Sequence, residues 1–155
     1  HFFGLKKENV IFFKQGLMPS VDENGKILME EKSKISMTPN GHGGSLKAIV
    51  DSNTSANLKA RGIKYLSYFQ VDNPLINIVD EVFVGQHIQA ASQMSSKMIA
   101  KNYAGEKVGH FCTLDGKLQV VEYSDLPMEY QELTDENGKL KFLSGSIAIH
   151  IIDID

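Results

Sequence analysis

The chain alternates between short apolar runs and polar, glycine-containing segments, and this pattern predicts a series of strands and helices. Residues 9–13 and 63–71 are rich in apolar, aromatic and β-branched side chains, as in strands buried on both faces. Residues 26–31 follow the Asn24-Gly25 dipeptide, a hairpin signal that predicts another strand. Further strands are predicted at 97–100, 108–114 and 117–123, the last two joined by a second hairpin signal at Asp115-Gly116.

Helical segments separate these strands. Residues 45–50 predict a helix with Ser45 as its N-cap, residues 55–61 predict one that Gly62 stops, and residues 80–91 predict one with an acidic first turn. Strands that alternate with helices indicate an α/β domain with a mixed, mostly parallel sheet. Because ligands bind at the carboxyl ends of the strands in such sheets, we look for chemistry in the segments that follow them.

Composition and charge exclude several classes of protein. The 155 residues carry 16 basic and 19 acidic side chains, a net charge of -3, without the basic stripe of a nucleic-acid binder. No apolar run approaches the roughly 20 residues of a membrane span, and no signal-peptide pattern is present. The one cysteine, Cys112, fits a reducing compartment. We therefore expect a cytoplasmic domain that binds neither nucleic acid nor membranes.

Residues 37–46 place three glycines around His42, ahead of a predicted helix. The segment lacks the Gly-Lys-Ser/Thr ending of a P-loop and the third glycine of a dinucleotide fingerprint. It still offers backbone without Cβ atoms, which a flat or anionic group can approach closely. A tight turn without any ligand would account for the same glycines. His42 suits a polar contact to a nucleotide, since no other histidine has metal-ligand spacing with it.

Two carboxylates follow predicted strands. Asp72 stands directly after the strand at 63–71, where α/β nucleotide enzymes place a ligand for a divalent cation. It could equally start the turn before Pro74. Glu122, near the end of the strand at 117–123, could accept hydrogen bonds from sugar hydroxyls, or could be a solvated residue at a strand end.

Four motifs, taken in order, resemble one family. FGLKKENVIFFKQGLMPSVDENGKILMEEKSKISMTPNGHGG, YFQVDNPL, VGHFCTLDGKLQVVEYSD and GSIAIH are similar to the central catalytic portion of the UDP-N-acetylglucosamine pyrophosphorylases, within the wider UDP-sugar pyrophosphorylase group. The resemblance covers practically all 155 residues. It implies a Rossmann-like nucleotidyltransferase fold, of which this chain would be part. It also implies the reaction of UTP with a sugar 1-phosphate to give a UDP-sugar and pyrophosphate, with Mg2+ as cofactor and without a protein nucleophile.

The resemblance also assigns roles to individual residues. Gln15 would contact uracil, the backbone of Gly41 would meet the base, and Asp72 would coordinate the metal. His42 would join them in binding and turning over the nucleotide. The residues implied around the sugar are Gly109, Glu122, Tyr123 and Ser146.

Two positions depart from the N-acetylglucosamine enzymes. His42 lies where those enzymes typically carry asparagine, and is shared with UDP-glucose and broad-specificity pyrophosphorylases. Ser146 replaces an asparagine that helps to define the sugar site, and a hydroxyl is shorter than an amide. The framework therefore implies N-acetylglucosamine 1-phosphate as the substrate, whereas the two substitutions favour glucose 1-phosphate or a relaxed pocket.

The resemblance further implies an upstream Gly-Gly-containing basic loop and a downstream lysine that hold the phosphates, and neither is in this sequence. We therefore expect residues 1–155 to be the central part of a single catalytic domain in a longer chain. Loss of such a clamp typically lowers the rate by ~10³-fold or more, so we do not expect turnover by these residues alone. The alternative is a non-catalytic nucleotide-binding or interaction module derived from such an enzyme. The sequence leaves the oligomeric state open.

Overall fold

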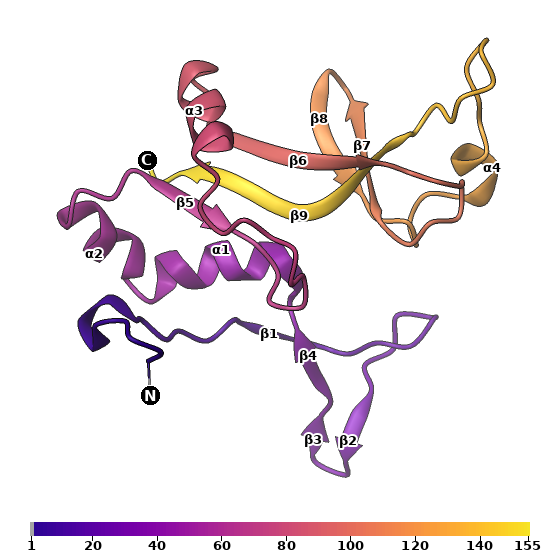
Figure 1. The fold of residues 1–155 in the computed structure, drawn as a ribbon. Coiled ribbons are helices and arrows are strands. Elements are labelled where there is room, and N and C mark those ends of the chain that lie inside the picture. Colours follow the sequence, from indigo (N-terminus) through magenta and orange to yellow (C-terminus); the bar gives the residue numbers. More distant parts are fainter. Residues whose placement is uncertain (1) are drawn as a thin grey trace. The chain divides into compact units, whose positions relative to one another are not determined.

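The computed structural model describes residues 2–155, which fall into two compact units. The first unit ends at Ile63 and the second runs from Lys64 to Asp155. Both units contain helices and strands, so the fold is mixed α/β (Figure 1). Among the described residues, no helix has the length and apolar character needed to cross a membrane.

The first unit holds two small antiparallel ladders and two helices. In order, its elements are the 3-10 turn η1 (Lys7–Asn9), β1 (Leu17–Pro19), β2 (Met29–Glu31), β3 (Lys34–Ile35), β4 (Met37–Pro39), α1 (Gly41–Asp51) and α2 (Thr54–Ala60). Strand β1 pairs with β4, and β2 pairs with β3. The hairpin signal at Asn24-Gly25 is confirmed, because Val21 and Ile27 on either side of it form an antiparallel bridge.

The strand predicted at residues 9–13 is wrong. Asn9 ends η1, and residues 10–13 form neither helix nor strand. Phe12 is 82% exposed, so this apolar run is not the buried strand that its composition suggested. An apolar run becomes a strand only where a neighbouring segment supplies a ladder, and pattern alone does not reveal that neighbour.

Helix α1 begins at Gly41, four residues before the predicted start at Ser45. The glycines that we interpreted as a loop ahead of the helix are its first turn, and Asn40 is the N-cap. Low helix propensity favoured a boundary after the glycines, but Gly41 has a φ of +76° and so turns the chain into the helix. The predicted stop of α2 at Gly62 is confirmed: Gly62 has a φ of +77°, and the Ile63 N–H donates to the carbonyl of Leu58 at 3.0 Å.

The second unit is built on one five-stranded sheet. Its elements are β5 (Tyr65–Tyr68), α3 (Glu81–Gln89), β6 (Met94–Ala100), β7 (Gly109–Leu114), β8 (Lys117–Val121), α4 (Met128–Gln131) and β9 (Ser144–Asp153). Strand β9 is central and pairs along one edge with β6. Strands β5 and β7 share its other edge. Strand β5 pairs with residues 150–153 of β9, and β7 pairs with Gly145 and Ser146 (Figure 1).

The expectation of a mostly parallel sheet is wrong for the described residues. Every pair of strands within residues 2–155 is antiparallel, β9 running against β5, β6 and β7. Alternating strands and helices suggested parallel pairing, because a crossover helix usually joins parallel neighbours. Here β5, β6 and β7 point the same way but do not pair with one another. Strand β9 separates β6 from β5 and β7, which pair with different stretches of its other edge.

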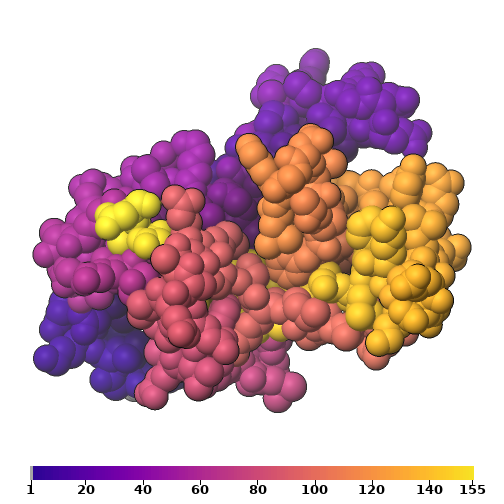
Figure 2. All heavy atoms as spheres, turned by 90° about the horizontal axis from the view of Figure 1, so that it is seen from above, coloured from indigo at the N-terminus to yellow at the C-terminus, as the bar shows by residue number. Residues whose placement is uncertain are grey.

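The β7–β8 hairpin confirms its turn signal. Asp115 and Gly116 have φ angles of +50° and +75°, as a type I′ turn requires. In the space-filling view the hairpin, drawn in orange, forms an exposed surface (Figure 2). Leu118, at 73% exposure, is among the apolar side chains on it.

The core of the second unit lies between α3 and β9. Phe83 on α3 packs with Ile149 and Ile151, which point to one face of β9 because strand side chains alternate. Asp80 caps α3 by accepting a hydrogen bond from the Phe83 N–H at 3.1 Å. It also forms an ion pair with Lys97, which holds the pKa of the Asp80 carboxyl below its usual value.

Candidate functional site

Gln15 and Gly41 meet in the first unit. The side-chain amide of Gln15 donates a hydrogen bond to the carbonyl of Gly41, although 26 residues separate them along the chain. The Asn40 N–H donates to the Gly16 carbonyl at 3.2 Å, so the segment before β1 lies against the start of α1. The resemblance had assigned both Gln15 and Gly41 to the uracil, and the structure brings them together.

A pocket of about 430 Å³ lies beside this contact. Its lining residues are Lys14, Gly16, Leu17, Asn40, Gly44, Lys47, Ala48, Asp51 and Ser52. Gly16 and Gly44 both leave room for the side chain of Asn40. A Cβ at Gly16 would lie 2.9 Å from Asn40 Nδ2, and one at Gly44 would lie 1.7 Å from Asn40 Oδ1. The glycines in this region therefore shape the wall of a cavity as well as a turn.

His42 is the second residue of α1 and is exposed. The first N–H groups of a helix point away from its body and carry partial positive charge, which favours anions near them. A histidine in this turn adds a polar side chain to those N–H groups. The arrangement suits a phosphate or a base carbonyl.

Gly109, Glu122 and Ser146 come together in the second unit. Gly109 and Ser146 are directly paired on β7 and β9. A Cβ at Gly109 would lie 3.6 Å from Ser146 Cβ, 3.6 Å from Glu122 Oε1 and 2.6 Å from Val120 Cγ1. The three predicted sugar residues thus share one face of the sheet, around a position that has no side chain.

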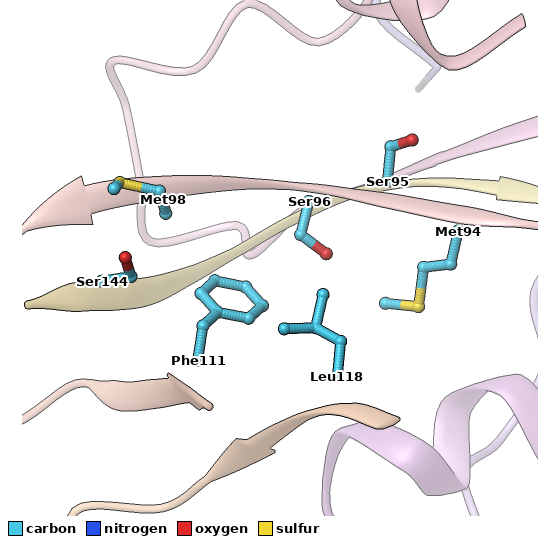
Figure 3. A pocket seen from close by; sticks show the side chains of 7 residues that line it. All are labelled: Met94, Ser95, Ser96, Met98, Phe111, Leu118 and Ser144. Atoms are coloured by element: carbon cyan, nitrogen blue, oxygen red, sulfur yellow. The ribbon is translucent and has the colours of Figure 1, made fainter. Parts of the chain in front are cut away.

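The same face of the sheet continues into a second pocket, of about 370 Å³. Phe111 and Ser144 lie two residues along their strands from Gly109 and Ser146, so they share that face. Figure 3 shows Phe111 and Leu118 on one side of β6, with the Ser96 hydroxyl directed toward them. The other lining residues are Met94, Ser95 and Met98. The pocket offers apolar surface and hydroxyl groups next to the predicted sugar residues.

Asp72 lies in the turn that follows β5, also in the second unit. Its side chain is exposed, and it makes no hydrogen bond or ion pair within residues 2–155. Strand β5 ends at Tyr68, opposite His150 of β9. Strand β7 begins at Gly109, opposite Ser146 on the same edge of β9. Strand β5 therefore runs toward the part of β9 at which β7 begins.

Tyr123 is the least integrated of the predicted sugar residues. It follows Glu122, the residue is 40% exposed, and its carbonyl accepts a hydrogen bond from Gln131 Nε2 at 3.0 Å. That bond anchors α4 to the end of β8. Gln15, Gly41 and His42 belong to the first unit and the other predicted residues to the second.

Comparison with known proteins assigns the chain to a family. The family model described as UTP--glucose-1-phosphate uridylyltransferase matches residues 1–152. The chain belongs to this uridylyltransferase family. It is 37% identical to the UDP-N-acetylglucosamine pyrophosphorylase of Saccharomyces cerevisiae over 156 residues, which cover 100% of this chain and 33% of that protein. The resemblance inferred from the four motifs is confirmed.

Solved structures of UDP-sugar pyrophosphorylases share the fold of this family member. The UDP-N-acetylglucosamine pyrophosphorylase of Trypanosoma brucei, in complex with an inhibitor, superposes with a TM-score of 0.83 at 32% identity, over 99% of this chain and 31% of that one. A UDP-glucose pyrophosphorylase variant from Leishmania major, in complex with UDP-glucose, superposes with a TM-score of 0.70 at 17% identity, over 90% and 32% of the two chains. The chain spans about a third of the length of the curated relatives that it matches.

Sequence reasoning missed one buried pair in this uridylyltransferase-family chain. Lys101 Nζ lies 2.6 Å from His110 Nε2, and the two residues are 5% and 0% exposed. Burial lowers the pKa of Lys101, whereas the nearby Glu106 carboxylate acts to raise it. Burial also lowers the pKa of His110, the Lys101 ammonium lowers it further, and the Val121 backbone and Glu122 act in the opposite direction. No sequence signal marks this pair, because the contact depends on how β6 and β7 flank β9.

Proposed function

We propose that this chain carries the nucleotide and sugar sites of a uridylyltransferase that acts on UTP and a sugar 1-phosphate. The observation that carries the proposal is the convergence of Gly109, Glu122 and Ser146 on one face of the sheet, in a member of this family. Gln15, Gly41 and His42 would bind the uridine side of the nucleotide. The Gln15–Gly41 hydrogen bond supports that assignment.

The proposed reaction is a direct displacement. An oxygen of the sugar phosphate attacks the α-phosphorus of UTP, the bond from that phosphorus to the bridging oxygen breaks, and pyrophosphate leaves. Catalysis then consists of positioning and charge neutralisation, which preorganised groups supply without a protein nucleophile. Glu122 and Ser146 would hold sugar hydroxyls beside Gly109.

Asp72 is the residue that we propose for Mg2+. Mg2+ in nucleotide enzymes is often bound by one or two carboxylates, with the remaining ligands from phosphates and water. A single exposed carboxylate without a protein partner fits that requirement, and residues 2–155 contain no group of three or more His, Cys, Asp or Glu side chains that would form a complete cage. When bound, the ion would neutralise charge on the phosphates during transfer. Asp72 itself would hold the ion, because its carboxylate would repel a phosphate directly.

The sugar is proposed to be N-acetylglucosamine or glucose, each as its 1-phosphate. The relatives at about a third identity are named for N-acetylglucosamine or N-acetylhexosamine, which supports the first. The shorter Ser146 supports the second. We also propose that residues 1–155 correspond to the central part of the catalytic domain, in keeping with their match to about a third of the relatives' length.

A thermal melt of the protein in Mg2+ tests the proposal, with and without excess UTP, UDP-glucose or UDP-N-acetylglucosamine. A ligand that binds only the folded state raises the midpoint by mass action. We expect a shift with UTP and a larger shift with one of the UDP-sugars, and ATP serves as the control. Pyrophosphate release from UTP and each sugar phosphate then separates an enzyme from a binding module. A cooperative melt that no uridine nucleotide shifts would contradict the proposal.

A further inference from the structure

We propose that Lys101 and His110 are a positioning pair for the sugar-side residues, in which a neutral His110 accepts a hydrogen bond from Lys101 through Nε2. The inference rests on the proposed function, since it assigns the pair to the support of Gly109 and Ser146. Neither residue would touch the substrate.

The pair lies on the opposite face of the sheet from the sugar-side residues. Gly109 and Ser146 are a directly paired position, and so are His110 and Gly145, one residue further along each strand. Because strand residues point alternately to the two faces, His110 and Gly145 face away from Glu122. A Cβ at Gly145 would meet Val108, Ile99 and Lys101, whereas one at Gly109 would meet Val120, Glu122 and Ser146. The pair Gly109 and Ser146 therefore points to one face of the sheet, and the adjacent pair His110 and Gly145 points to the other.

Lys101 crosses the central strand to reach His110. It follows β6, and His110 lies on β7, on the opposite edge of β9. The crossing passes over Gly145, where a Cβ would lie 3.4 Å from Lys101 Cγ and 2.8 Å from Val108 Cγ2. The absence of a side chain at Gly145 leaves the path open. Lys101 therefore ties β6 to β7 directly behind Ser146.

The same ammonium group holds the segment that leads into β7. Lys101 Nζ donates to the carbonyl of Ala104 at 2.7 Å as well as to His110. The His110 ring is fully buried, and Lys101 is the side-chain hydrogen-bond partner of its Nε2 atom. Loss of the ammonium would release both the 102–108 segment and the His110 ring. Gly109 stands between them.

The charge state of His110 follows from the contact. Two positive charges at 2.6 Å in a buried environment repel strongly, so the ammonium of Lys101 excludes an imidazolium. Glu106 is the carboxylate whose charge acts on Lys101, and the charge of Glu122 acts on His110 from the other face of the sheet. A neutral ring that accepts at Nε2 must carry its proton on Nδ1, the less common tautomer of histidine in water.

Nitrogen-15 NMR of the imidazole groups tests the pair without reference to activity. We expect His110 to be neutral at pH 7, with its proton on Nδ1, and Lys101→Met to abolish that preference. Lys107→Met is the matched control, since Lys107 is an exposed lysine of the same segment. A His110 protonated on Nε2 in the wild-type protein would overturn the proposal.

Ligand binding tests the positioning role. In Lys101→Met we expect affinity for the UDP-sugar to fall about 10-fold while affinity for UTP changes by less than about twofold, because only the sugar side is displaced. A Lys101→Met/His110→Leu variant, which leaves no buried charge, should fold and show the same selective loss. The single variant His110→Gln keeps Lys101, and its amide oxygen can replace Nε2 as the acceptor. We therefore expect it to retain most of the wild-type affinity for the UDP-sugar.

The two proposals fail in different ways. A wild-type protein that binds neither UTP nor a UDP-sugar overturns the proposed function and this inference with it. Wild-type binding together with equal UDP-sugar affinities in Lys101→Met and Lys107→Met overturns this inference alone.

Discussion

The side chain of Asn40 occupies the space that a side chain at Gly44 would need. A Cβ atom at Gly44 would lie 1.7 Å from Asn40 Oδ1 and 2.3 Å from Asn40 Cγ. Asn40 is the N-cap residue of α1 and Gly44 lies one turn further along the helix. The two residues therefore constrain each other at the point where the chain turns into the predicted uracil-binding helix.

We expect Gly44→Ala to lower the free energy of unfolding by about 1–2 kcal/mol, because it forces the Asn40 side chain out of place. Alanine in a helix interior is otherwise about 1 kcal/mol more favourable than glycine. In an Asn40→Ala background, where the obstacle is gone, Gly44→Ala should therefore be stabilising. Denaturant melts of the four proteins in this cycle measure the coupling. A stabilising Gly44→Ala in the wild-type background would show that Asn40 does not constrain position 44.

We expect Gly109→Ala to destabilise the second unit by about 1–3 kcal/mol, since its Cβ would lie 2.6 Å from Val120 Cγ1. Adding Val120→Ala should recover most of that stability. The new methyl group would still lie against Glu122 and Ser146, so UDP-sugar affinity should stay low in the double variant. Thermal melts combined with calorimetric titration separate the two effects, and full UDP-sugar affinity in the double variant would remove Gly109 from the sugar site.

Asp72→Asn should abolish the Mg2+ dependence of nucleotide binding and lower turnover by about 10²-fold or more, because it removes a charge while keeping the shape of the side chain. The matched control is Asp115→Asn in the β7–β8 turn, where asparagine is as well tolerated as aspartate. Titration of UTP with and without Mg2+ gives the comparison. A Mg2+ response that is equal in the two variants would contradict the metal role of Asp72.

Ser146→Asn should shift preference toward N-acetylglucosamine. The longer amide can reach an acetamido group that a hydroxyl cannot, and one such polar contact changes relative affinity by about 10-fold or more. Ser144→Asn, two residues away on the same face of β9, is the control. The ratio of affinities for UDP-N-acetylglucosamine and UDP-glucose is the measurement, and equal shifts in both variants would indicate a general effect of bulk on that face.

The stability of the second unit should fall as the pH drops below about 6.5. The pKa of His110 lies below its usual 6.5 in the folded protein, so the unfolded chain takes up the proton first. The loss begins near pH 6.5 and ends once the pH has passed below the folded pKa. In His110→Gln the melting temperature should depend less on pH in this window. A wild-type profile that is equally flat would show that His110 protonates freely in the folded state.

Local signals determined several parts of this protein. Gly62 ends α2 and Asp115-Gly116 turns β7 into β8, because each depends on φ angles that few residue types adopt. Asp80 likewise caps α3 through its own side chain. The ordered motifs, which lie along the whole chain, are sufficient by themselves to identify the family.

Tertiary structure decided what depends on distant segments meeting. The sheet is antiparallel because β9, the last strand, inserts among β5, β6 and β7, and a repeating pattern of strands and helices carries no information on that order. The start of α1 depended on Asn40 fitting against Gly44 and Gly16. Lys101 and His110 were unremarkable in sequence, since their contact exists only where Gly145 leaves a path across β9. Sequence thus determined local conformation and kinship, whereas strand pairing decided which side chains share a face.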